Sequence, residues 1–246
     1  MAFTSLALLF SGLNAHASIV ISTTRIILNQ QKGEAVAQLT NRGKSPLLVQ
    51  AWIDDGNANA DPTSIQVPFS ITPSIARIDP GKGQTVRIFS QNNNLPKNRE
   101  SLFWFNVLEV PPVPNSELLQ SENFMQIALR TRIKLFYRPA SLSISPSAAY
   151  ELLSFELHPT NNQYAVVVKN PSPYYITFNR LELQLTDKTT LPVQMEDSQS
   201  KMIAPFSETV LPVPGLKNTP AAGAKFFYLI INDSGGTTRG EKPLTR

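Results

Sequence analysis

FMQIALRTRIKLFY, residues 124–137, is the stretch of sequence that most constrains the fold. Apolar and polar residues alternate along it, as they do in a β-strand with one buried face. One face carries Met125, Ile127, Leu129, Ile133 and Leu135, and the other carries Gln126, Arg130, Arg132 and Lys134. The pattern predicts one long strand with two interpretations. It is either a half-buried strand with a solvated basic face, or an edge strand whose backbone and apolar side chains are offered to another chain.

Shorter strand-like runs precede this stretch. They are separated by turn signals such as Asn41-Arg42-Gly43 and Asp79-Pro80-Gly81. Their spacing is typical of an immunoglobulin-like sandwich of about seven strands. The expected strands are residues 19–28, 34–40, 47–54, 85–90 and 102–110.

A second set of runs follows Arg138-Pro139 and predicts a second, smaller sandwich. The expected strands are residues 151–157, 164–169, 174–185, 208–213 and 225–231. We therefore expect an N-terminal domain over residues 18–139 and a C-terminal domain over 140–246, with Ser141 to Ser147 as a bent linker. Twenty prolines and many β-branched residues agree with an all-β fold class.

The first 17 residues have the pattern of a secretory signal peptide. An apolar segment from Phe3 to Leu13 is followed by Ala15-His16-Ala17, which has the small-x-small form of a cleavage site. The apolar segment is too short to span a bilayer, and no other segment is a membrane candidate. We expect an exported, soluble protein without direct membrane insertion.

Composition excludes several kinds of catalytic site. The chain has no cysteine, and His158 is the only histidine outside the predicted signal. A Cys/His zinc site, a Ser-His-Asp triad and thiol chemistry are therefore excluded. The net charge of +4 is too small to indicate a dedicated nucleic-acid binder.

Three local patterns resemble functional motifs and are incomplete. Asp55 to Asp61 resembles the start of a calcium loop, but Ala60 replaces the turn glycine. Ser198 and Lys201 have the spacing of Ser-Lys acyl-transfer enzymes without the other signature elements, so an exported hydrolase of that type is a further alternative. The basic and aromatic residues of 130–138 could also form a nucleic-acid stripe, an interpretation that export disfavours.

Several segments in order along the chain resemble the periplasmic chaperones of the chaperone/usher pathway, the PapD/FimC-like family. The resemblance covers about residues 19–236. Its most specific segments are Arg99 to Pro112 and Ala128 to Pro139. The supporting segments are Thr24 to Ile27, Gln50 to Asp54, Asp79 to Gly81, Asn170 to Ile176 and Ile231 to Gly236.

This resemblance implies two immunoglobulin-like domains in an L-shaped arrangement with a cleft between them. By match to the family, Arg25 and Lys134 would hold the C-terminal carboxylate of a pilus subunit in the cleft. The donor strand that completes the subunit's fold would present Met125, Ile127 and Leu129. An interdomain charge cluster would consist of Glu100, Arg138 and Asp233.

The resemblance also implies the partners and the location. The partners would be pilus or fimbrial subunits and an outer-membrane usher, in the periplasm, with no enzymatic activity, cofactor, metal or nucleic acid. The resemblance also allows the free protein to self-associate and cap its donor strand. The short segment 112–123 favours the short-loop branch of the family. The competing interpretation is an exported structural or adhesive protein with tandem immunoglobulin-like domains, which needs neither a converging cation pair nor an exposed apolar row.

Overall fold

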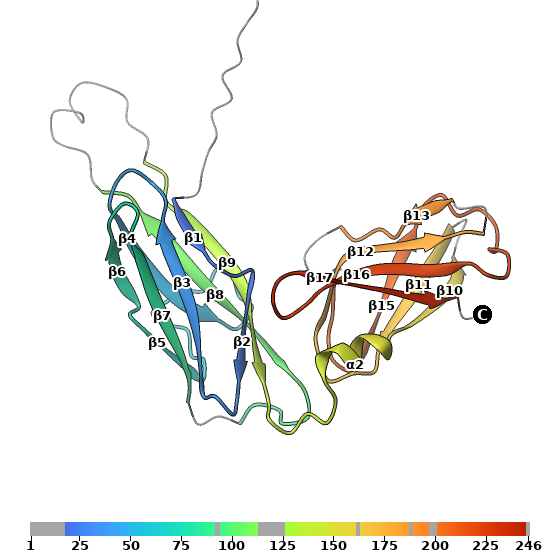
Figure 1. Cartoon of the computed structure of the whole chain (residues 1–246), viewed down its shortest axis with the longest axis horizontal. Coiled ribbons are helices and arrows are strands. Elements are labelled where there is room, and N and C mark those ends of the chain that lie inside the picture. The colour runs from blue at the N-terminus through green and yellow to red at the C-terminus, as the bar shows by residue number, and fades with distance from the viewer. Residues whose placement is uncertain are drawn as a thin grey trace, which may run out of the picture.

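A computed structural model of the chain describes residues 18–91, 94–112, 126–160, 163–186, 189–196 and 201–244. These residues form two β-sandwiches set at an angle to each other and joined at one end, with one short helix at the junction (Figure 1). The prediction of an all-β protein with two immunoglobulin-like domains is confirmed. The predicted signal peptide and Met125 lie outside the described residues.

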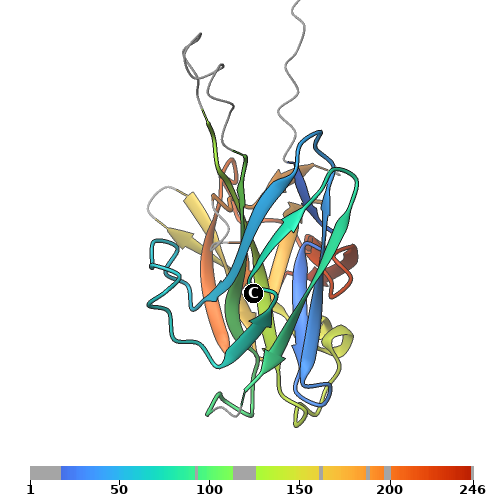
Figure 2. The ribbon, with the colours of Figure 1, turned by 90° about the vertical axis from the view of Figure 1, so that its left-hand side faces the viewer.

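The N-terminal sandwich contains nine strands in the described part of the chain. They are β1 (Ile19–Ile21), β2 (Arg25–Asn29), β3 (Glu34–Asn41), β4 (Leu47–Asp54), β5 (Phe69–Thr72), β6 (Ile75–Ile78), β7 (Gly83–Ser90), β8 (Ser101–Val110) and β9 (Leu129–Arg138). One sheet has the order β1-β3-β7-β5 and the other has the order β2-β9-β8-β4-β6. Figure 2 shows this sandwich in front of the C-terminal one. Strands β5 and β6 were not predicted.

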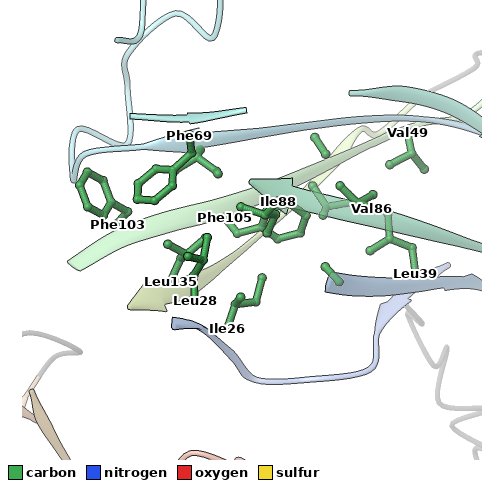
Figure 3. Close-up of a cluster of buried hydrophobic side chains, with 14 of the residues drawn as sticks. Ile26, Leu28, Leu39, Val49, Phe69, Val86, Ile88, Phe103, Phe105 and Leu135 are labelled. Atoms are coloured by element: carbon green, nitrogen blue, oxygen red, sulfur yellow. The ribbon is translucent and has the colours of Figure 1, made fainter. Parts of the chain in front are cut away.

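The core of this domain lies between the two sheets (Figure 3). Phe105, Ile88 and Leu135 come from three different strands and are 0% exposed. Phe69 and Phe103 extend the core at one end, where their ring centroids lie 4.8 Å apart in an edge-on arrangement. Since Leu135 belongs to this cluster, one face of β9 is part of the domain's own core.

The predicted single strand over residues 19–28 is wrong, because the chain changes sheets within it. Strand β1 pairs antiparallel with β3, and β2 pairs parallel with β9 in the opposite sheet. The crossing occurs at Ser22 to Thr24, where short polar residues replace the apolar run. As a consequence, β2 reaches β9 only from Arg25 onward.

The predicted strand over residues 124–137 is also too long at its start. Strand β9 begins at Leu129, opposite Glu109 of β8, and residues 126–128 are not in a strand. Its partner β8 ends at Val110 and is followed by Pro111 and Pro112, which have no backbone N–H to continue the ladder.

The C-terminal sandwich begins after a short helix, α2 (Pro146–Glu151). Its strands are β10 (Ser154–Thr160), β11 (Gln163–Asn170), β12 (Ile176–Gln184), β13 (Thr190–Pro192), β14 (Met202–Ile203), β15 (Ser207–Val213), β16 (Lys225–Ile231) and β17 (Thr237–Pro243). One sheet has the order β10-β11-β15 and the other has the order β13-β12-β16-β17, with β14 also pairing with β12. The prediction of a strand from residue 151 is wrong, because Ser145 caps the helix and Pro146 opens it.

Candidate functional site

Two cations lie side by side where β2 meets β9. Arg25 and Lys134 are directly paired in the parallel register, on the face of the sheet that points away from the core. Arg25 is 7% exposed, and its guanidinium carbon lies 5.6 Å from the centre of the Phe136 ring. Its NH1 donates a 2.9 Å hydrogen bond to the carbonyl of Ile231 in the other domain. The pair therefore lies at the junction of the two domains.

Neither cation has an anionic partner in the described part of the chain. Lys134 makes no ion pair there, and Arg25 Nε is buried without a hydrogen-bond partner. Burial, together with the positive charge of Arg25, lowers the pKa of Lys134 to about 8. Burial also lowers the pKa of Arg25. Two partly desolvated cations without an anion between them form a site that a carboxylate would stabilise.

An apolar row leads away from this pair along β9. On its core-facing side Leu135 is 0% exposed, Ile133 is half-buried and Leu129 is 43% exposed. Ile127, two residues before the strand, is 61% exposed. The row therefore begins inside the core of the domain and ends on its surface.

The backbone edge beside the exposed part of this row is open. Strand β9 pairs with β2 from Lys134 to Arg138, whereas among the described strands Leu129 to Ile133 pair only with β8. The open edge begins directly next to the Arg25–Lys134 pair, because β2 starts at Arg25. Such an edge can accept one further strand by backbone hydrogen bonding.

The basic face of β9 is not simply solvated, which corrects the first of the two interpretations of this strand. Arg132 forms an ion pair with Asp54, and Arg130 donates to Asn106 Oδ1 with 3.0 and 2.7 Å hydrogen bonds. The two guanidinium carbons also lie over tryptophan rings, Arg130 at 4.8 Å from Trp52 and Arg132 at 4.1 Å from Trp104.

Asp54 is a residue that sequence reasoning missed as part of this region. The sequence places it at the end of the expected strand 47–54, next to an Asp54-Asp55-Gly56 turn signal, and assigns it no role in a site, but it is 0% exposed at the end of β4. Burial alone would raise the pKa of Asp54, but hydrogen bonds from Arg132, Asn106 and Gly56 lower it below its usual value. The available signal was an acidic residue directly after the apolar Trp52-Ile53 pair.

The three residues of the predicted charge cluster form one ion-pair network across the domain junction. Arg138 Nε donates a 2.8 Å hydrogen bond to Glu100 Oε1. Its NH1 and NH2 donate bonds of 2.6 and 2.9 Å to the two carboxylate oxygens of Asp233 in the other domain. Glu100 Oε2 also accepts a 2.9 Å bond from the Tyr175 backbone N–H.

Burial and hydrogen bonding shift the pKa values in this network. Burial raises the pKa of Glu100, although Arg138 partly opposes that effect. Burial would lower the pKa of Arg138, but its bonds to Asp233 and its attraction to Glu100 raise it overall. Because the one Arg138 guanidinium bonds to a carboxylate of each domain, the network can connect two otherwise independent sandwiches.

A small cavity between the domains adjoins the network. The same cavity is lined by tyrosines of the second domain that sequence reasoning did not single out. Tyr174 packs its ring 5.0 Å below the Arg138 guanidinium and donates a 2.6 Å bond to the Ile144 carbonyl. The lining residues are Arg25, Ile27, Glu100, Phe136, Arg138, Pro146, Tyr150, Tyr174, Tyr175 and Asp233.

The incomplete motifs gain no support from the structure. Within the described residues there is no group of three or more His, Cys, Asp or Glu that could hold a metal ion, which includes the Asp55 to Asp61 stretch. Ser198 lies outside those residues. Among the helices that are described, none is long and apolar enough to cross a membrane.

Family models match nearly all of the described chain. The model for "Pili and flagellar-assembly chaperone, PapD N-terminal domain" matches residues 18–143, and "Pili assembly chaperone PapD, C-terminal domain" matches residues 148–242. The chain belongs to the PapD-like pilus assembly chaperones. The resemblance stated from the sequence is confirmed.

Curated relatives agree with this assignment. The chain is 44% identical over 229 residues to "Probable fimbrial chaperone YadV" of Escherichia coli, covering 93% of this chain and 90% of that protein. It is 42% identical over 228 residues to "Chaperone protein FimB/FhaD" of Bordetella pertussis, covering 91% and 87%. The family assignment favours a binding role over a catalytic one.

Solved structures of PapD-like chaperones share the fold. The crystal structure of the YadV chaperone has a TM-score of 0.76 at 40% identity, covering 93% of this chain and 100% of that one. The SafB chaperone of Salmonella enterica, solved in complex with the SafA pilin, has a TM-score of 0.72 at 22% identity and therefore supports the fold alone. The interpretation as a plain adhesive or structural tandem sandwich is not favoured.

Proposed function

We propose that this PapD-like chaperone binds pilus subunits in the periplasm by lending them a strand, and that it anchors the subunit's C-terminal carboxylate on Arg25 and Lys134. One observation carries the proposal. An open backbone edge begins directly beside two cations that have no anionic partner in the described part of the chain, and it runs along β9 to the exposed apolar side chains of Leu129 and Ile127. The three features together fit an extended chain that ends in a carboxylate.

The apolar row would supply most of the affinity. A subunit whose sandwich lacks a strand exposes its own core, and Ile127 and Leu129 can fill part of that gap, with Met125 as the next residue of the row. Each aliphatic side chain that becomes fully buried contributes about 1.5–3 kcal/mol. Backbone hydrogen bonds to the open edge at Leu129 to Ile133 would fix the orientation of the bound strand and would contribute less to the binding free energy.

The cation pair would set the register. A register shift of one residue would turn the subunit's apolar residues to the wrong face, and a shift of two would move its carboxylate away from Lys134. Charge-assisted hydrogen bonds of this kind contribute about 1.5–3 kcal/mol each. The carboxylate anchor therefore distinguishes the correct strand register from registers shifted by one or two residues.

The Glu100–Arg138–Asp233 network would hold the angle between the domains. Arg138 connects a carboxylate of each domain, so that the angle sets the width of the space next to Arg25.

We further propose that residues 1–17 are a cleaved signal and that the domain boundary lies at residues 139/140. We also propose that the chaperone delivers bound subunits to an outer-membrane usher, that the free protein self-associates through β9, and that no catalytic step is involved.

Co-purification with the subunit tests the anchor. Lys134→Ala should remain folded and lose capture of a co-expressed pilus subunit, and Arg25→Ala should do the same. Lys82→Ala, which removes an exposed lysine of the same domain, is the matched control and should capture the subunit normally. Normal capture by both Lys134→Ala and Arg25→Ala would show that the carboxylate anchor is wrong.

A further inference from the structure

The part of β9 that forms the open edge, Leu129 to Ile133, lacks two of the usual supports of a strand. Within the part of the chain that the structure describes, Leu129 to Ile133 pair with β8 on one side only. Their apolar side chains are only partly used by the core, since Ile133 packs against it but is half-buried and Leu129 is 43% exposed. A strand segment with one neighbour and few core contacts is expected to fray.

The opposite face of the same segment is held firmly. Asp54 is buried on β4, two strands away from β9, and Arg132 Nε donates a 3.0 Å hydrogen bond to its Oδ2. Arg130 NH2 approaches Asp54 Oδ2 at 3.5 Å, and Asn106 of the intervening strand β8 donates a 2.8 Å bond to the same oxygen. The carboxylate thus connects three adjacent strands.

The other carboxylate oxygen of Asp54 is also satisfied. Its Oδ1 accepts a 2.8 Å bond from the Gly56 backbone N–H and a bond from Arg132 NH2. Because both oxygens are fully used and no part of the side chain is exposed, Asp54 is unavailable to an external ligand. Its partners Arg130 and Arg132 are both in the segment that lacks a second strand.

We propose that Asp54 is a positioning residue for partner binding, which keeps Leu129 to Ile133 extended and in register before a partner arrives. A segment that is already ordered loses less conformational entropy when a strand pairs with it. Ion pairing to Asp54 also keeps Arg132 from competing with Lys134, two residues further on the same face, for an incoming carboxylate. This inference rests on the proposed role of β9 as the lent strand.

Hydrogen exchange of the free protein tests the positioning without any partner. In Asp54→Asn, which keeps the shape of the side chain and removes its charge, those amides of Leu129 to Ile133 that donate to β8 should exchange at least tenfold faster. Exchange in β3 and β7 should be unchanged. Glu34→Gln, which removes the cross-strand ion pair with Arg87 in the other sheet, is the matched control and should leave β9 unchanged.

Rescue and capture complete the test. Asp54→Glu should restore slow exchange in β9. If Asp54→Asn folds poorly, Arg132→Gln replaces it and should also speed exchange in β9. Capture of the co-expressed pilus subunit should fall at least tenfold in Asp54→Asn. Unchanged exchange in β9, or equally faster exchange throughout both sheets, would overturn the inference. Faster exchange in β9 with no capture by the wild type would instead refute the proposed function and leave the positioning role intact.

Discussion

Replacing Ile127 with aspartate should separate partner binding from the stability of the chain itself. Ile127 is 61% exposed. Because complete burial of an isoleucine contributes about 1.5–3 kcal/mol, burial of its exposed part in a subunit contributes about 1–2 kcal/mol. Placing a carboxylate in the exposed apolar core of the subunit costs several kcal/mol more. A total loss of about 4 kcal/mol or more corresponds to a roughly thousandfold weaker complex.

The free Ile127→Asp protein should be nearly as stable as the wild type. Substitutions at exposed positions without special contacts usually change the free energy of unfolding by no more than about 0.5 kcal/mol, which is a shift of a few degrees in Tm. The assay is therefore a pair of measurements. Subunit capture from co-expressing cells reports binding, and thermal unfolding of the isolated chaperone reports stability.

Two variants calibrate the result. Val36→Asp changes a side chain that is 55% exposed in the other sheet, and it should affect neither measurement. Leu135→Asp changes a residue of the same β9 row that is 0% exposed, and it should prevent folding. The reasoning is refuted if Ile127→Asp captures the subunit like the wild type, or if it destabilises the free chain as strongly as Leu135→Asp does.

The pKa of Lys134 is about 8 in the free protein, and a bound carboxylate would raise it. Subunit affinity should therefore fall as the pH rises through 8, by up to roughly tenfold per pH unit. Measurements of Kd at pH 7 and 9 check this, and Lys134→Arg should flatten the pH dependence. Arg138→Ala leaves the buried Glu100 without its ion pair and should cost about 3–5 kcal/mol in chemical denaturation, whereas Arg77→Ala, from an exposed pair, should cost less than about 1 kcal/mol. Gly240 lies directly opposite Tyr228, and a methyl group at this position would overlap the tyrosine ring, so Gly240→Ala should lower the Tm of the C-terminal domain. Gly236→Ala should not lower it, because a Cβ there would lie no closer than 3.7 Å to its nearest neighbour, the Asn232 side chain.

The sequence predicted the fold class well because strand periodicity is local. Alternation along residues 34–40, 47–54 and 102–110 matches β3, β4 and β8 within a residue or two. The change of sheet between β1 and β2 was missed, because no proline or glycine interrupts residues 19–28. The helix α2 was missed as well, since its six residues are too few to show a helical period.

The candidate site depended on information that periodicity lacks. Arg25 and Lys134 are adjacent only because two distant strands pair in parallel, and no local pattern predicts such a pairing. Their assignment came from the family resemblance. Asp54 was missed for the opposite reason, since its local Asp-Asp-Gly context predicts an exposed turn, whereas partners on β8 and β9 bury it.

In the proposed function, the two faces of β9 would divide two tasks that otherwise conflict. A strand is usually held in place by the burial of its apolar side chains, but side chains buried at home cannot enter a partner. Here the basic face is attached to its own sheet through Asp54 and the tryptophans, so the apolar side chains at Leu129 and Ile127 need not be buried for the strand to stay ordered. Under the proposed function, the alternation therefore has a physical basis other than that of an ordinary half-buried strand: ion pairs hold the strand in place, and its exposed apolar side chains would be left for another chain.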